Sequence, residues 1–156
     1  MKKWFFLSGI VILATLQLSW PVFLSFFNCR PDLLLIFVLA AVFYLDFKTA
    51  LIFSILAGLT KDAFLPSVIA LNTILFSIWS YLVYRLSRQI STDNDYVRLL
   101  LVLIISSLNN IIISLQIFNS GNIIPAGIFL RNLIVTALYT TALSPLIFKL
   151  AKKISA

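Results

Sequence analysis

The sequence contains no histidine, a single cysteine (Cys29), and charged side chains at only 11% of its 156 positions. Without histidine, a catalytic Ser-His-Asp or Cys-His arrangement is impossible, and a zinc site of the usual kind is excluded. One cysteine allows no internal disulfide bond. No glycine-rich phosphate loop, nucleotide motif or internal repeat is present. We therefore expect no enzymatic activity, no metal and no cofactor.

What the chain has instead is apolar side chains, which make up 62% of it. A soluble domain of this length has too high a surface-to-volume ratio to bury so many of them. Long apolar runs are typical of integral membrane proteins. The net charge of +7 could indicate nucleic-acid binding in a soluble protein. Here, however, the basic residues flank apolar runs, as they do at the cytoplasmic ends of membrane spans. We expect membrane lipid around the protein and no nucleic acid.

The central stretch, residues 30–62, consists of two short apolar segments joined by a charged turn at residues 46–48. This pattern predicts a membrane hairpin. Pro31 and Asp32 suit the first turn of a helix, where the missing N–H of proline costs nothing and a negative charge meets the positive end of the helix dipole. The uncharged core that follows, residues 33–45, is about 20 Å of helix, which is shorter than the hydrocarbon core of about 30 Å. Either protein shields its ends or the segment does not cross fully.

The apolar runs predict an all-α fold with six transmembrane helices in one bundle, a single domain over residues 1–156. The expected spans are 4–27, 31–45, 47–65, 67–84, 99–118 and 126–150. Trp4 and Trp20 are expected as anchors at the membrane interface, and Pro21 should kink or end the first span. That run is too long for the apolar part of a typical signal peptide, and no A-x-A-like site follows, so we expect a retained span.

The distribution of basic residues predicts the orientation. With six spans and a cytoplasmic N-terminus, both termini are cytoplasmic, nine basic residues lie inside and three outside, and the inverted orientation reverses this ratio. The inner set is Lys2, Lys3, Lys48, Arg85, Arg88, Arg98, Lys149, Lys152 and Lys153, and the outer set is Arg30, Lys61 and Arg131.

Ionisable residues inside spans are the first candidates for function. Asp32, Asp62 and Arg131 are expected at similar depth near the outer side. We hypothesise that Arg131 pairs with Asp62 or Asp32 across helices. The alternative is that Arg131 reaches the headgroups on its own.

Small and polar residues also recur at helical spacing. Ala50, Ser54 and Gly58 form a face that suits close packing on the second segment or a later helix, or docking of a partner's helix. Polar stripes occur on three later segments, and they indicate either interhelical hydrogen bonds or a ligand cavity. We favour hydrogen bonds because the stripes carry no charge. The stripes are Asn132, Thr136, Thr140 and Ser144; Ser106, Asn110 and Ser114; and Thr73, Ser77 and Tyr81.

The central stretch resembles the rod shape-determining protein MreD family. The likeness is carried by Arg30, Pro31 and Asp32 directly before the apolar run, by the Ala-Gly-Leu at 57–59, and by Asp62 four residues after Gly58. Six short-looped spans in about 160 residues also fit this family. After Asp62 the sequence reads AFLPS, where family members commonly have Ser-Gly and a further glycine.

The resemblance implies a non-catalytic, multi-pass component of the bacterial inner membrane that acts in cell elongation. It implies binding to MreC, and through MreC to the MreB filament, the glycan polymerase RodA and the transpeptidase PBP2, so that peptidoglycan synthesis and cell shape are localised or regulated. The family's bundle is similar to the substrate-binding subunits of energy-coupling-factor vitamin transporters, which raises the alternative of a small-molecule transporter subunit. The candidate motif, structural or partner-binding residues are Arg30, Pro31, Asp32, Gly58, Asp62 and Arg131.

Overall fold

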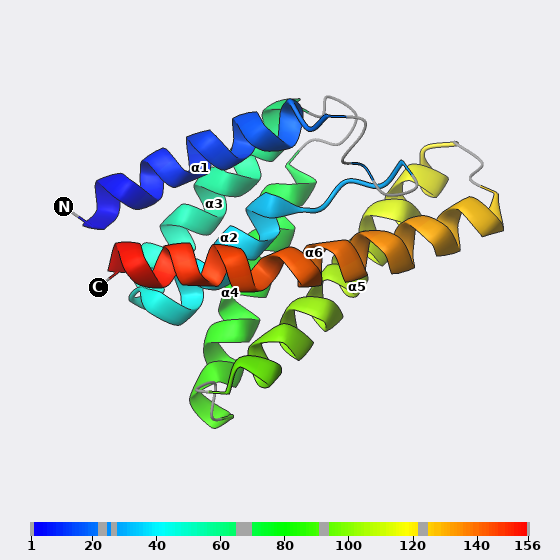
Figure 1. Cartoon of the computed structure of the whole chain (residues 1–156). Helices are drawn as coiled ribbons and strands as arrows, with labels where there is room; N and C mark the ends of the chain where they lie inside the picture. Colours follow the sequence, from blue (N-terminus) through cyan, green and yellow to red (C-terminus); the bar gives the residue numbers. More distant parts are fainter. Residues whose placement is uncertain are drawn as a thin grey trace.

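The computed structural model describes residues 2–21, 25, 28–64, 70–90, 94–121 and 125–155. The regular structure of these residues is helical, in agreement with the expected all-α class. The helices are α1 (Lys2–Leu18), α2 (Leu33–Tyr44), α3 (Phe47–Phe64), α4 (Leu71–Gln89), α5 (Asp95–Asn119) and α6 (Ala126–Ser155). The beginning of α1 and the end of α6 lie on the same side of the molecule (Figure 1).

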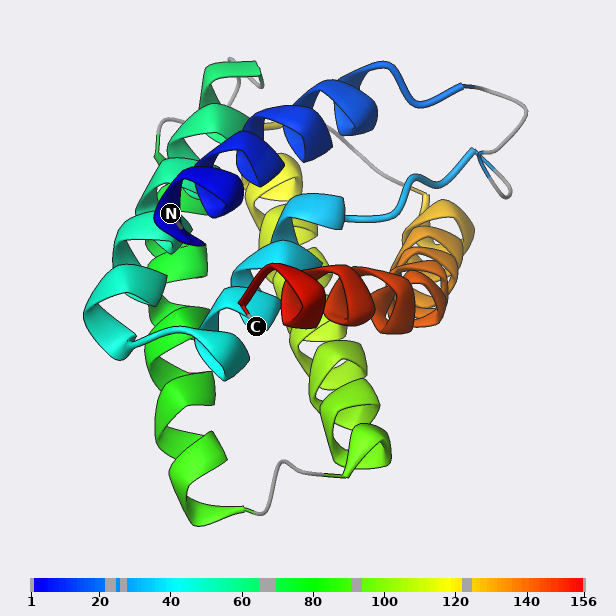
Figure 2. The same cartoon turned by 60° about the vertical axis from the view of Figure 1, so that its left-hand side comes forward.

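Helix α2 forms the centre of the molecule (Figure 2). Every residue from Leu33 to Val42 is buried, because α1, α3, α4 and α6 all pack against this helix. A helix that is apolar all round needs such cover on every side. Its 12 residues span about 18 Å, well short of a hydrocarbon core of about 30 Å. Neighbouring helices therefore cover this short segment on its sides.

Helix α1 ends at Leu18, before Pro21, so the expectation that Pro21 kinks or ends the first span is confirmed as an end of the helix. Residues 19–21 are not helical, and residues 22–24, 26 and 27 lie outside the described part of the chain. The cause is Pro21, which lacks the N–H needed for the helical bond and disfavours helical backbone in the residue before it. Of the two tryptophans expected as interface anchors, Trp4 is exposed and Trp20 packs against the bundle. Trp20 is half-buried, and its ring meets Tyr139 of α6 edge-on with centroids 6.2 Å apart.

The small-residue face of α3 packs against α4. Ala50, Ser54 and Gly58 are buried there, and α3 and α4 form the most extensive helix pair of the described fold. A β-carbon at Gly58 would lie 2.4 Å from the Cα of Thr73, so only glycine lets the two backbones come this close. The predicted close packing on a later helix is confirmed. The suggested use of this face by a partner's helix is wrong, because α4 already occupies it.

Helix α4 runs from Leu71 to Gln89, which is later in the sequence than the expected segment 67–84. Arg85 and Arg88 therefore belong to its last turns instead of following its end. Residues 65–69 lie outside the described residues.

Helices α5 and α6 are the longest, with 25 and 30 residues, and they pack against each other (Figure 1). Both are long and apolar enough to cross a membrane, judged by length and composition, whereas α1 and α2 are shorter apolar helices. Pro145 lies inside α6 and cannot donate to the carbonyl of Thr141. The hydroxyl of Ser144 donates to that carbonyl at 2.7 Å, so the carbonyl has a hydrogen-bond partner within the helix.

Candidate functional site

The N-terminus of α2 is buried, so its N–H groups need partners from the protein. Asp32 is its N-cap residue, and the carboxylate accepts a hydrogen bond from the N–H of Leu35 at 3.2 Å. Neighbouring helices supply the other acceptors. The amide oxygen of Gln17 on α1 accepts from the N–H of Leu34 at 3.2 Å, and the hydroxyl of Thr140 on α6 accepts from the N–H of Asp32 at 3.1 Å. The start of α2 therefore connects α1 and α6.

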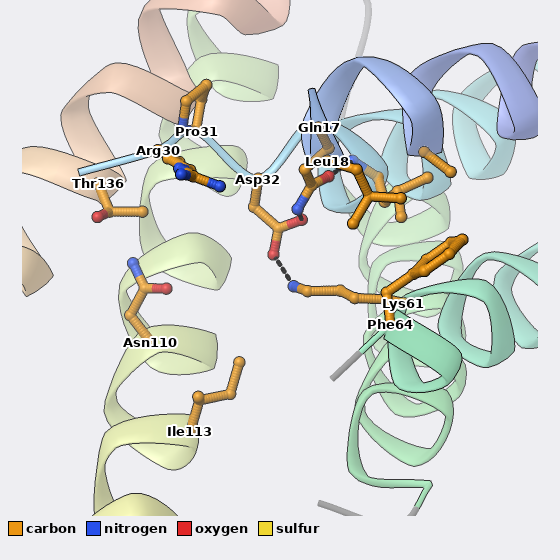
Figure 3. A pocket seen from close by; sticks show the side chains of 12 residues that line it. Gln17, Leu18, Arg30, Pro31, Asp32, Lys61, Phe64, Asn110, Ile113 and Thr136 are labelled. Atoms are coloured by element: carbon orange, nitrogen blue, oxygen red, sulfur yellow. Dashed lines mark hydrogen bonds and ion pairs between the residues drawn. The ribbon is translucent and has the colours of Figure 1, made fainter. Parts of the chain in front are cut away.

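The carboxylate of Asp32 also forms an ion pair with the ammonium group of Lys61 on α3 (Figure 3). The side chain of Lys61 is 11% exposed and that of Asp32 is 8% exposed. The ring of Phe76 on α4 lies 5.1 Å from Nζ of Lys61, measured to the ring centroid. Because both charges have lost most of their hydration, each depends on the other for stabilisation.

Asp62, the next residue along α3, binds a different helix. Its carboxylate accepts hydrogen bonds from the backbone N–H groups of Asn72 and Thr73 at 3.0 and 2.9 Å, from the Asn72 amide at 2.8 Å and from the Thr73 hydroxyl at 2.6 Å. These donors belong to the first turn of α4. The N-cap residue of α4, Ala70, has a left-handed backbone with φ of 57° and no side-chain oxygen. Asp62 therefore supplies the cap that Ala70 cannot.

A pocket of about 320 Å³ opens beside the ion pair between Asp32 and Lys61. Figure 3 shows these two side chains pointing toward each other, with Asn110 of α5 and Thr136 of α6 on the facing wall. The polar lining consists of Gln17, Arg30, Asp32, Lys61, Asn110 and Thr136, and the apolar lining consists of Ala14, Leu18, Pro31, Leu34, Phe64 and Ile113. The pocket can therefore receive a group that is apolar on one side and polar on the other.

The structure divides the candidate residues into two groups. Arg30, Pro31 and Asp32 line the pocket. Gly58 and Asp62 hold α3 against α4, the first by close backbone approach and the second by capping. The second group is therefore explained by packing, whereas the first group borders a space that another molecule can enter.

Arg131 belongs to neither group: it is exposed on α6 and is not part of the pocket lining. The hypothesis that it pairs with Asp62 or Asp32 is wrong. The Asp32 carboxylate forms its ion pair with Lys61 instead, and the Asp62 carboxylate accepts hydrogen bonds from the first turn of α4. Lys61 is the partner that the sequence reasoning missed. The available signal was the helical geometry, since adjacent residues on a helix point about 100° apart, and Lys61 and Asp62 must therefore face different neighbours.

Residues of the polar stripes form interhelical hydrogen bonds and part of the pocket lining. Thr140 makes the interhelical bond to α2 described above, and Asn132 accepts a hydrogen bond from the thiol of Cys29 at 3.3 Å. Asn110 and Thr136 line the pocket. The sequence reasoning also missed a buried bond in which the indole N–H of Trp79 on α4 donates to Asn109 on α5 at 3.2 Å.

The chemistry of the pocket is that of a binding site. It contains one carboxylate and two cationic side chains, and the carboxylate is already engaged by Lys61 and by the start of α2. Within the described residues, no three His, Cys, Asp or Glu side chains gather as metal ligands. Such an arrangement can hold and orient a bound group, but it does not present a base poised to move a proton.

The fold is that of a small all-helical protein with a buried central helix and polar groups directed inward, in which α5 and α6 are long and apolar enough to cross a membrane. The family described as rod shape-determining protein MreD matches residues 1–154. The chain belongs to this family, as the resemblance around Arg30 and Asp62 indicated, and hence to membrane proteins with a role in determining rod shape. No curated protein and no solved structure matches the chain.

Proposed function

We propose that this protein is a non-catalytic inner-membrane component of the bacterial cell-elongation complex, and that it binds MreC through the pocket beside Asp32. Through MreC it associates with MreB, RodA and PBP2 and helps to localise or regulate peptidoglycan synthesis. The observation that carries the proposal is the position of Arg30, Pro31 and Asp32. These are the residues by which the sequence resembles its family, and they line the pocket of about 320 Å³.

The lining of the pocket fits a protein segment next to a membrane span. Leu18 and Phe64 are exposed apolar residues at its edge, and they can contact apolar side chains of a partner. Arg30 is exposed as well, and its guanidinium group can donate to backbone carbonyls or to a carboxylate. The ion pair of Lys61 with Asp32 forms a fixed polar wall.

The proposed orientation has six spans, both termini in the cytoplasm and the pocket toward the outside. It is supported by the bias of basic residues and by the position of both chain ends on one side of the molecule (Figure 1).

A second candidate function is the substrate-binding subunit of a vitamin-type transporter. The observation in its favour is the same pocket, whose volume of about 320 Å³ lies at the lower end of the range of small-molecule sites.

Affinity purification of the tagged protein from membranes in mild detergent, followed by mass spectrometry, separates these functions. We expect MreC and the elongation enzymes to be recovered. Arg30→Ala should reduce recovery of MreC about tenfold, the equivalent of about 1.4 kcal/mol. Arg131→Ala is the matched control, because it removes an exposed arginine that does not line the pocket.

Equal recovery of MreC with both variants would contradict the role of the pocket, although not membership of the complex. Recovery of ATP-binding-cassette ATPases with a coupling subunit, in place of MreC, would favour the transporter.

A further inference from the structure

A second group of charged side chains lies where α4 ends and α5 begins. Both views show this end extending beyond the other helices (Figures 1 and 2). Arg85 and Arg88 are exposed here. Each of them contacts a tyrosine one turn earlier on α4. Arg85 donates to the hydroxyl of Tyr81 at 3.1 Å. Arg88 donates to the hydroxyl of Tyr84 at 2.6 Å and lies 4.9 Å from the centroid of its ring.

These two guanidinium groups keep most of their donors available. Each has five N–H bonds, and the bond to tyrosine uses one of them. Residues three apart lie on the same helix face, so Arg85 and Arg88 are neighbours. Within the described residues, the carboxylate ion pairs involve Lys61 and Arg98 and not these two arginines. The paired N–H donors of two adjacent guanidinium groups match the oxygens of a phosphate group.

An exposed apolar stripe leads along α4 to this pair. Ile74, Ile78 and Tyr81 are all exposed and are spaced by four and three residues, so they share one face with Arg85 and Arg88. Arg85 lies 11 residues after Ile74, which corresponds to about 16 Å of helix, close to half of a hydrocarbon core of about 30 Å. The stripe is therefore as long as one leaflet and ends in two cations.

We propose that this stripe binds one molecule of an anionic phospholipid, with its phosphate between Arg85 and Arg88 and its acyl chains along Ile74, Ile78 and Tyr81. Such a lipid combines an apolar body and a phosphate at the spacing that the stripe offers. A partner's transmembrane helix could cover the apolar part, but it would need its own acidic pair at the level of the arginines. The stripe is separate from the pocket, so this inference does not rest on the proposed function.

The test is native mass spectrometry of the protein released from nanodiscs that contain phosphatidylglycerol and phosphatidylcholine in equal amounts. We expect one retained phosphatidylglycerol per chain. Arg85→Gln/Arg88→Gln should lower its retention at least tenfold. Lys149→Gln/Lys153→Gln is the matched control: it removes two exposed positive charges from the end of α6 and should leave retention unchanged. Arg85→Lys/Arg88→Lys should weaken retention only a few-fold, because lysine keeps the charge but lacks the planar guanidinium group with its paired N–H donors.

Three results would overturn the inference. The first is equal retention by the wild type and the Arg85→Gln/Arg88→Gln variant. The second is retention of phosphatidylcholine as strong as that of phosphatidylglycerol. The third is loss of a co-purifying protein, with lipid retention unchanged, which would assign the stripe to a partner's helix. A melting curve for each variant identifies any variant that fails to fold. If Arg85→Gln/Arg88→Gln fails to fold, lipid retention is compared between the wild type and Arg85→Lys/Arg88→Lys instead.

Discussion

The ammonium group of Lys61 and the carboxylate of Asp32 form an ion pair at the buried start of α2. The same carboxylate caps α2, and the backbone N–H of Asp32 donates to Thr140 on α6. A single residue therefore fixes the central helix relative to two others and forms one wall of the pocket. The integrity of the pocket and the stability of the bundle should depend on this pair together.

We predict that Lys61→Met destabilises the protein by about 3–5 kcal/mol, because it leaves the Asp32 carboxylate buried without a counter-charge. The measurement is thermal or denaturant-induced unfolding of the purified protein in detergent.

The double variant Lys61→Met/Asp32→Asn provides the control for this prediction. It removes both charges, and asparagine remains a good N-cap residue. We expect it to recover most of the lost stability. If the double variant is no more stable than Lys61→Met, the cost arises from lost packing of the lysine chain and not from the unpaired charge.

Asp62 should behave as a capping residue. Asp62→Ala removes the acceptor of four hydrogen bonds at the first turn of α4, and loss of a cap costs about 0.5–2 kcal/mol. The expected loss lies at or above the upper end of this range, because the donors left behind are partly buried. Asp62→Asn keeps one acceptor oxygen and should lose less.

Asp95→Asn is the matched control for Asp62, since the side chain of Asp95 is 89% exposed. It should change stability by no more than about 0.5 kcal/mol. Unfolding midpoints that are the same for Asp62→Ala and Asp95→Asn would contradict the capping role.

Much of the architecture followed from local patterns. The hairpin of α2 and α3 and the close packing of Gly58 could be predicted, because a charged break separates two apolar segments and small residues recur at helical spacing. The turn itself is formed by Leu45 and Asp46 and not by residues 46–48, because Phe47 and Lys48 already belong to α3. The end of α1 could be predicted as well, since Pro21 acts through its own backbone. The late start of α4 could not, because its cap comes from Asp62 on another helix and Ala70 gives no local signal.

The candidate site could also be predicted only in part. Asp32 could be placed at a helix start from the sequence, but its partner could not: Arg131 was considered as a partner of Asp62 or Asp32, and the partner of Asp32 is Lys61. Charge and estimated depth are similar for both cations. Which one reaches Asp32 depends on how α3 and α6 are rotated about their axes, and this rotation is fixed by packing over the whole bundle.

Gly58→Ala should separate α3 from α4. The added β-carbon would lie 2.4 Å from the Cα of Thr73 and 2.8 Å from its backbone nitrogen, and backbone atoms cannot move aside as a side chain can. We predict a loss of about 1–3 kcal/mol, as for other overpacked interiors. Gly127→Ala is the control, because nothing lies within 4 Å of its β-carbon position, and it should be neutral or stabilise by up to about 1 kcal/mol. Similar melting temperatures for both variants would contradict the close contact.

Filling the pocket should abolish partner binding without unfolding the protein. Ile113 on α5 lines the pocket and is half-buried, so a tryptophan at this position can extend into the cavity of about 320 Å³. We predict that Ile113→Trp lowers recovery of MreC at least tenfold, which corresponds to about 1.4 kcal/mol or more. Leu108→Trp adds the same ring to an exposed position of α5 outside the pocket and should leave recovery unchanged. If Ile113→Trp remains folded and still recovers MreC like the wild type, the partner binds elsewhere on the bundle.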